Sequence, residues 1–182
     1  MRETTGGGLR DERMFSLFQD DRARIWVSGA RGVMYLENGR FTPVSAVPGQ
    51  HVVSMTGDGT GGLWISQGQS LVHRAAEGVV EQIPWASLGH KDFAQSLLSD
   101  PLQGGLWLGF GRRGVAYLNE GHVLRSYAAA DGLGEGRVND LRLDRDGTLW
   151  AATEGGLSRL KNGRVTTLTR VRMGYRAIRS SG

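Results

Sequence analysis

The chain has 182 residues, enough for one domain with a buried core. Its 39% hydrophobic and 22% charged residues exclude a compositionally disordered protein, and the absence of Cys excludes disulfides and thiolate metal sites. A net charge of +4 and a pI near 9.9 would suit a nucleic-acid-binding protein, but arginines 170, 172, 176 and 179 account for the whole excess. The 29 Gly and only 4 Pro indicate many tight turns between short strands.

Four tryptophans divide the chain into repeats, at spacings of 38, 43 and 43 residues. An Asp stands six or seven residues before each Trp, and a Gly stands 13 or 14 residues after it. These structural repeat positions are Trp26, Trp64, Trp107, Trp150, Asp20, Asp58, Asp100, Asp144, Gly39, Gly78, Gly121 and Gly163. A period near 43 residues is typical of the blade of a β-propeller.

Each repeat predicts four short strands. The first strands cover 14–20, 52–58, 94–100 and 138–144, and each ends in a turn that begins with the repeat Asp. The second strand holds the Trp, and a Gly turn such as Asn38-Gly39 or Asn162-Gly163 separates the third strand from the fourth. The predicted repeats are about 9–43, 44–83, 84–127 and 128–168, and together they form a partial propeller over 1–168.

The long connections predict which strand is innermost and which face binds a ligand. They span 44–51, 84–92 and 127–137, and they carry the chain from the outer strand of one blade to the inner strand of the next. Since strand direction alternates, they share a face with the bends after each Trp, which contribute Arg31, Gln69, Arg113 and Glu154. The candidate ligand-binding residues on this channel face are Arg13, His51, Phe93, Arg112 and Arg137.

Other chemistry-bearing residues favour structural roles. Asp144-Arg145-Asp146-Gly147 begins like a calcium loop but lacks the further carboxylates, which favours a hairpin turn with Asp accepting backbone N–H bonds. The four histidines lack metal-pair spacing, and His73 and His122 are expected at the surface. The repeat tryptophans could form a stacking platform, but packing between blades is favoured. For Trp85, capping a blade edge is favoured over facing a ligand. We expect no metal, cofactor or catalytic group.

The fourth repeat, DGLGEGRVNDLRLDRDGTLWAATEGGLSRLKNGRVTTL (131–168), resembles the two-component regulator propeller repeat. It shares the Gly-Leu lead, the apolar pair, Asp-x-x-Gly-x-Leu-Trp, a small residue and Thr, and then Gly-Gly-Leu. The resemblance implies a sensor module, usually periplasmic, ahead of a membrane span and a histidine kinase or other output domain in a dimeric receptor. It also implies about seven blades. The expected fold is therefore all-β, with four four-stranded antiparallel blades of a larger ring.

These observations predict a non-catalytic, ligand-sensing module of a two-component receptor whose signal is a small molecule, saccharide or peptide. The alternatives are a propeller enzyme of the lactonase or lyase type, or a plain protein-interaction scaffold. No signal peptide and no apolar run of roughly 18 residues is found, so the sequence assigns no location to this chain and no membrane span within it.

The segment 169–182 departs from the repeat. If the codons of Met173-Gly174-Tyr175-Arg176 are read in a frame shifted one base earlier, they can encode the Gly-Leu pair with which a further blade would begin. We therefore predict that this segment is translated out of frame and forms a disordered basic tail. A propeller truncated at four blades would leave two open blade faces, and it is expected to self-associate or dissolve poorly.

Overall fold

The computed structural model describes residues 13–29, 32–44, 47 and 52–168. These residues form sixteen strands in four antiparallel sheets, each with its strands in chain order across the sheet. The first blade contains β1 (Met14–Gln19), β2 (Ile25–Gly29), β3 (Gly32–Glu37) and β4 (Arg40–Val44). The second contains β5 (Val52–Gly57), β6 (Leu63–Gln67), β7 (Ser70–Arg74) and β8 (Val80–Pro84).

The third blade contains β9 (Ala94–Asp100), β10 (Gly105–Phe110), β11 (Val115–Asn119) and β12 (His122–Tyr127). The fourth contains β13 (Val138–Leu143), β14 (Leu149–Thr153), β15 (Gly156–Lys161) and β16 (Arg164–Leu168). Two short 3₁₀ helices, η1 (Trp85–Leu88) and η2 (Ala129–Asp131), lie in the connections that follow the second and third blades. The predicted all-β fold with four four-stranded antiparallel blades is thus confirmed.

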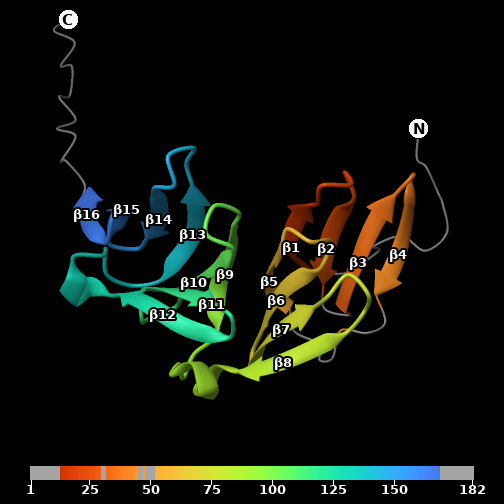
Figure 1. Cartoon of the computed structure of the whole chain (residues 1–182), viewed down its shortest axis with the longest axis horizontal. Helices are drawn as coiled ribbons and strands as arrows, with labels where there is room; N and C mark the ends of the chain where they lie inside the picture. The colour runs from red at the N-terminus through yellow and green to blue at the C-terminus, as the bar shows by residue number, and fades with distance from the viewer. Residues whose placement is uncertain (1–12, 30–31, 45–46, 48–51, 169–182) are drawn as a thin grey trace, which may run out of the picture.

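The first strand of each blade is innermost, as the connection lengths predicted. β1 packs against β5, β5 against β9, and β9 against β13, so the four sheets follow one another around an open arc (Figure 1). A side-chain bond repeats at two of these contacts: the Met55 N–H donates to Ser16 Oγ at 3.2 Å, and the Leu97 N–H donates to Ser54 Oγ at 3.1 Å. The inner strands are therefore tied across the blades by side chains rather than by a continuous backbone ladder.

The core consists of three clusters, one at each junction between successive blades. Trp26, Val33 and Met55 belong to the cluster between the first and second blades. The first and third junctions leave little space, because a glycine of one blade lies against a larger side chain of its neighbour. A Cβ atom added at Gly109 would lie 2.7 Å from Val138 Cγ1, for example.

The predicted Asn-Gly hairpins have the backbone that their sequence favours. Asn38 and Gly39 have φ of 50° and 75°, and Asn162 and Gly163 have φ of 51° and 74°. Two successive positive φ angles match the right-handed twist of the flanking strands. In the part of the chain that the structure describes, no helix has the length and apolar character needed to cross a membrane.

Candidate ligand-binding face

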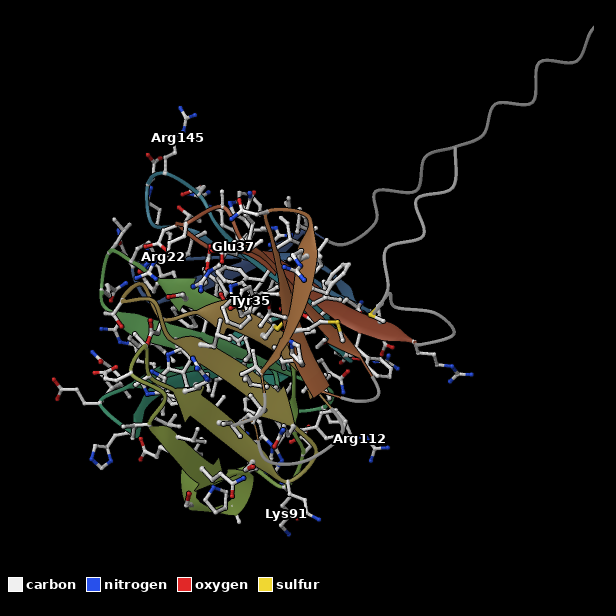
Figure 2. The ribbon with its side chains drawn as sticks, turned by 90° about the vertical axis from the view of Figure 1, so that its right-hand side faces the viewer. Arg22, Tyr35, Glu37, Lys91, Arg112 and Arg145 are labelled. Atoms are coloured by element: carbon white, nitrogen blue, oxygen red, sulfur yellow. The ribbon has the colours of Figure 1, made fainter. Side chains whose placement is uncertain are left out.

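In the second and fourth blades, a connection between blades meets the bend after the Trp on one face of the molecule. The Glu154 N–H donates to the Arg137 carbonyl at 3.1 Å, and the Arg137 N–H donates to Glu154 Oε2 at 3.1 Å. In the second blade, the Trp85 N–H donates to the Gln69 carbonyl at 3.3 Å. Figure 2 shows Arg112, from a bend of this face, and Arg145, from an inner hairpin turn, on opposite sides of the molecule.

Those of the predicted ligand-binding residues that the structure describes have different surroundings. Arg13 and Arg112 are exposed. Arg137 is exposed as well, with its Nε 3.9 Å from Glu154 Oε1, so part of its charge is balanced. Phe93 is half-buried and packs against the core cluster between the second and third blades. His51 lies outside the described residues.

His90 was not singled out from the sequence, yet among the described residues it is a buried histidine in the connection between the second and third blades. Its ring is 7% exposed and stacks on Phe110 with 3.8 Å between centroids and 7° between planes. Burial lowers the pKa of His90, the Asp92 carboxylate opposes that shift, and the Arg113 guanidinium adds to it. His90 is therefore neutral near pH 7.

Unpaired polar atoms gather next to His90. Both carboxylate oxygens of Asp92 and Nδ1 of His90 are buried without a hydrogen-bond partner in the described structure. A buried polar atom without a partner costs about 1–3 kcal/mol, so this corner of the face has unused hydrogen-bonding capacity. The only sequence signal was a short polar run, Gly89-His90-Lys91-Asp92, inside a connection.

The repeat aspartates serve the opposite, hairpin face. The Trp Nε1–H groups of Trp26, Trp107 and Trp150 donate to Oδ2 of the preceding Asp at 2.8, 3.2 and 3.1 Å. The other carboxylate oxygen accepts backbone N–H bonds within the turn, as Asp144 does from Asp146 and Thr148. The bond from the Thr148 N–H, followed by the one from Trp150, lowers the pKa of Asp144. The Asp144 sequence therefore forms a hairpin turn, and no group of three His, Asp or Glu side chains suited to a metal occurs among the described residues.

The second blade varies this arrangement and corrects one expectation. His73 was expected at the surface, but its side chain is only 27% exposed. His73 Nε2 lies 2.9 Å from Asp58 Oδ2, and its ring stacks on Trp64 with 4.0 Å between centroids. Burial of Asp58 opposes ionisation, but the bonds from His73 and Thr60 outweigh it and lower the pKa of Asp58. The residue paired with the repeat Trp on the neighbouring strand has an aromatic ring that packs on the Trp in each of the first three blades. In the second blade this residue is His73, and the ring contact covers its side chain.

Trp85 caps the junction between the second and third blades. It is buried, its Nε1–H donates to the Gln67 carbonyl at 2.8 Å, and its ring meets Phe110 edge-on. The favoured capping interpretation is confirmed. His122 is exposed, as predicted.

Comparison with known proteins supports the repeat assignment. The family model "Two component regulator propeller" matches residues 132–155. The fourth blade carries a two-component regulator propeller repeat. The match covers the η2–β13 connection, β13 and β14, and it ends at the bend that places Glu154 against Arg137. No curated protein matches the chain.

Several solved propellers share the fold of this repeat-containing chain. A catalytically inactive virginiamycin B lyase from Staphylococcus aureus, solved with Quinupristin, has a TM-score of 0.72 at 16% identity. The extracellular domains of two proteins described as hybrid two component systems, from B. thetaiotaomicron, have TM-scores of 0.67 and 0.66 at 17% and 20% identity. The matches cover 91%, 86% and 86% of this chain, which spans 58% of the lyase and 22% and 24% of the two extracellular domains.

Proposed function

We propose that the chain is a ligand-sensing propeller module of a two-component receptor and that it works without catalysis. The observation that carries this proposal is the two-component regulator propeller match at 132–155, in a blade whose fold agrees with extracellular domains of two-component systems. In that setting the parent receptor is dimeric, with the propeller outside the cytoplasm and a kinase or other output domain beyond a membrane span. The ring is completed to about seven blades.

The proposed signal binds over the face that contains Arg112. Arg112 and Arg113 are exposed in the bend after Trp107 without a described ion pair, and Asp92 and His90 of the preceding connection add unpaired polar atoms near Arg113. An anionic saccharide or an acidic peptide would pair with the guanidinium groups, because a planar guanidinium binds carboxylates through two hydrogen bonds. Binding would shift the connections between blades and so alter their packing.

A thermal-shift screen against neutral and acidic oligosaccharides and short peptides tests this assignment. We expect an acidic compound to raise the melting temperature of the chain, and Arg112→Ala to abolish that rise. Arg145→Ala is the matched control, because Arg145 is also exposed but lies on the hairpin side (Figure 2). A stabilising compound whose effect survives both Arg112→Ala and Arg137→Ala would refute the proposed face.

A second candidate is a propeller enzyme of the lyase type. It is favoured by the fold shared with the virginiamycin B lyase and with a streptogramin B lyase, the latter at a TM-score of 0.66 and 16% identity. Metal analysis of the purified chain, together with a lyase and lactonase activity screen with and without divalent ions, separates the two candidates. Metal-dependent turnover would establish the enzyme and remove the non-catalytic sensor.

A further inference from the structure

The connection that leads into the third blade places a histidine where the fourth blade has a buried leucine. The helices η1 and η2 each end at a glycine in the left-handed region, Gly89 and Gly132, with φ of 78° and 93°. The next residue is buried in both connections: His90 is 7% exposed and Leu133 is 4% exposed. In both, its N–H donates to the carbonyl five positions earlier, at 3.0 and 3.2 Å. An imidazole therefore replaces the apolar side chain of the Gly-Leu lead.

A carboxylate lies between connection and bend in both blades, but the two blades supply it from opposite sides. In the fourth blade, Glu154 of the bend lies against Gly136 of the connection and accepts a bond from the Arg137 N–H at 3.1 Å. In the third blade, Asp92 has the position of Gly136, and Gly111 has the position of Glu154. A Cβ atom added at Gly111 would lie 3.9 Å from Asp92 Oδ2, yet neither oxygen of Asp92 has a described partner.

No side chain ties the corner of the third blade closed. In the described structure, no side-chain hydrogen bond or ion pair joins residues 89–93 to residues 111–114. Lys91, Arg112 and Arg113 are exposed, and Figure 2 shows Lys91 and Arg112 projecting outward. A ligand reaches the buried oxygens of Asp92 only if the bend moves, and this movement breaks no side-chain bond. It uncovers three unpaired atoms, which are both Asp92 oxygens and His90 Nδ1.

The charges at this corner have both signs. Burial is the main cause that lowers the pKa of His90; the Asp92 carboxylate opposes it and the Arg113 guanidinium adds to it, so both charges act on one imidazole. A purely anionic ligand on Arg112 and Arg113 would be repelled by Asp92 and would leave that buried carboxylate unpaired. A ligand that also has an ammonium group satisfies the carboxylate, and neutral His90 can accept a further bond through Nδ1.

We propose that this corner binds a small amino acid, a zwitterion whose two charges pair with the two signs of charge in the site. Its ammonium group donates to Asp92 and to His90 Nδ1, and its carboxylate pairs with the guanidinium groups of Arg112 and Arg113. The guanidinium half rests on the proposed function, and the ammonium half goes beyond it. Binding moves the bend 111–114 away from the connection 89–93 and so couples the ligand to the junction between the second and third blades.

Isothermal titration calorimetry on the full 182-residue chain tests the ammonium half. Glycine, β-alanine and γ-aminobutyrate separate the two charges by increasing numbers of methylene groups, whereas butyrate lacks the amine and butylamine lacks the carboxylate. We expect one of the amino acids to bind at least about tenfold more tightly than butyrate and butylamine, because a hydrogen bond to a charged group is worth about that factor.

Two variants and a control locate the ammonium group. Asp92→Asn retains the shape of the side chain, and it should weaken binding of that amino acid at least about tenfold without weakening butyrate. The double variant Asp92→Gly/Gly111→Glu rebuilds the fourth-blade corner, since Gly111 is outside the left-handed region, and it should also lose the amino acid. Asp21→Asn is the control, because Asp21 is an exposed carboxylate in the hairpin turn of the first blade, and it should change neither affinity.

The outcomes separate this inference from the proposed function. Amino acids that bind no more tightly than butyrate and butylamine, or not at all, overturn the ammonium site. An amino-acid affinity that survives both Asp92 variants, each with an unchanged far-UV CD spectrum, also overturns it. If Asp92→Asn alone fails to fold, the double variant decides. Butyrate binding that Arg112→Ala abolishes would support the proposed face even where the ammonium site fails.

Discussion

The close approach of Gly109 to Val138 makes the junction between the third and fourth blades a test of how the repeats fit together. A Cβ atom at Gly109 would lie 2.7 Å from Val138 Cγ1 and 3.3 Å from Leu141 Cδ1. Gly109 is not in the left-handed region, so a substitution there is opposed by crowding rather than by its φ angle. We expect Gly109→Ser to lower the free energy of unfolding by about 1–3 kcal/mol, the usual cost of overpacking a core.

The preceding junction shows how the crowding can be relieved. Ser66 occupies the position of Gly109 there, Ala94 occupies the position of Val138, and Ser66 Oγ donates to the Ala94 carbonyl at 2.6 Å. Val138→Ala alone removes two buried methyl carbons and leaves a cavity, at a cost of about 2 kcal/mol. In the double variant the added side chain fills that cavity. We therefore expect the double variant to be at least about 1 kcal/mol more stable than the sum of the single effects predicts.

Urea unfolding followed by circular dichroism measures this coupling between positions 109 and 138. The unaltered protein, Gly109→Ser, Val138→Ala and the double variant are compared at one protein concentration. Gly68→Ser is the matched control, because Gly68 is exposed and nothing lies within 4 Å of its added Cβ, so its effect should stay within about 0.5 kcal/mol. Additive single effects, or a Gly109→Ser variant as stable as the control, would refute the argument that residue size at this position is set by the next inner strand.

Two further predictions use other buried polar groups. Ser28 Oγ is buried without a hydrogen-bond partner, whereas Ser66 Oγ, at the same repeat position, donates a hydrogen bond. In urea titrations, Ser28→Ala should therefore raise the free energy of unfolding and Ser66→Ala should lower it, each by about 1 kcal/mol. Changes of the same sign in both variants would contradict this. Since burial lowers the pKa of folded His90 below 6.5, the unfolded chain binds more protons as the pH falls through 6.5, and stability should drop from there down to the folded pKa. His90→Phe should reduce the dependence of the melting temperature on pH between 7.5 and 5.5, whereas His122→Phe, at an exposed histidine, should leave it unchanged. An equal change of melting temperature with pH in both variants would rule out His90 as the cause of the pH dependence.

The sequence was most informative where the same physical demand recurs in every blade. The Asp before each Trp must satisfy turn N–H groups, so it repeats at four places and its hairpin could be predicted. The order of strands followed from connection lengths, and the Asn-Gly turns followed from the φ angles that those residues tolerate. Positions such as His90 and Asp92 lie in a connection that differs in length and composition between blades, so no repeat marked their burial.

Variation at a fixed repeat position shows how the same blade can serve different roles along the arc. The strand partner of the repeat Trp is Tyr35, His73 or Tyr117 in the first three blades, where another blade follows and an aromatic ring is covered. In the fourth blade it is Arg159, whose guanidinium remains exposed in a groove with Lys161 and Arg164. The fourth blade therefore differs from the other three at this position in charge as well as in aromatic character. The fourth blade supplies one carboxylate to this groove itself, since Lys161 Nζ lies 3.8 Å from Asp146 Oδ2, whereas Arg159 and Arg164 have no described ion pair.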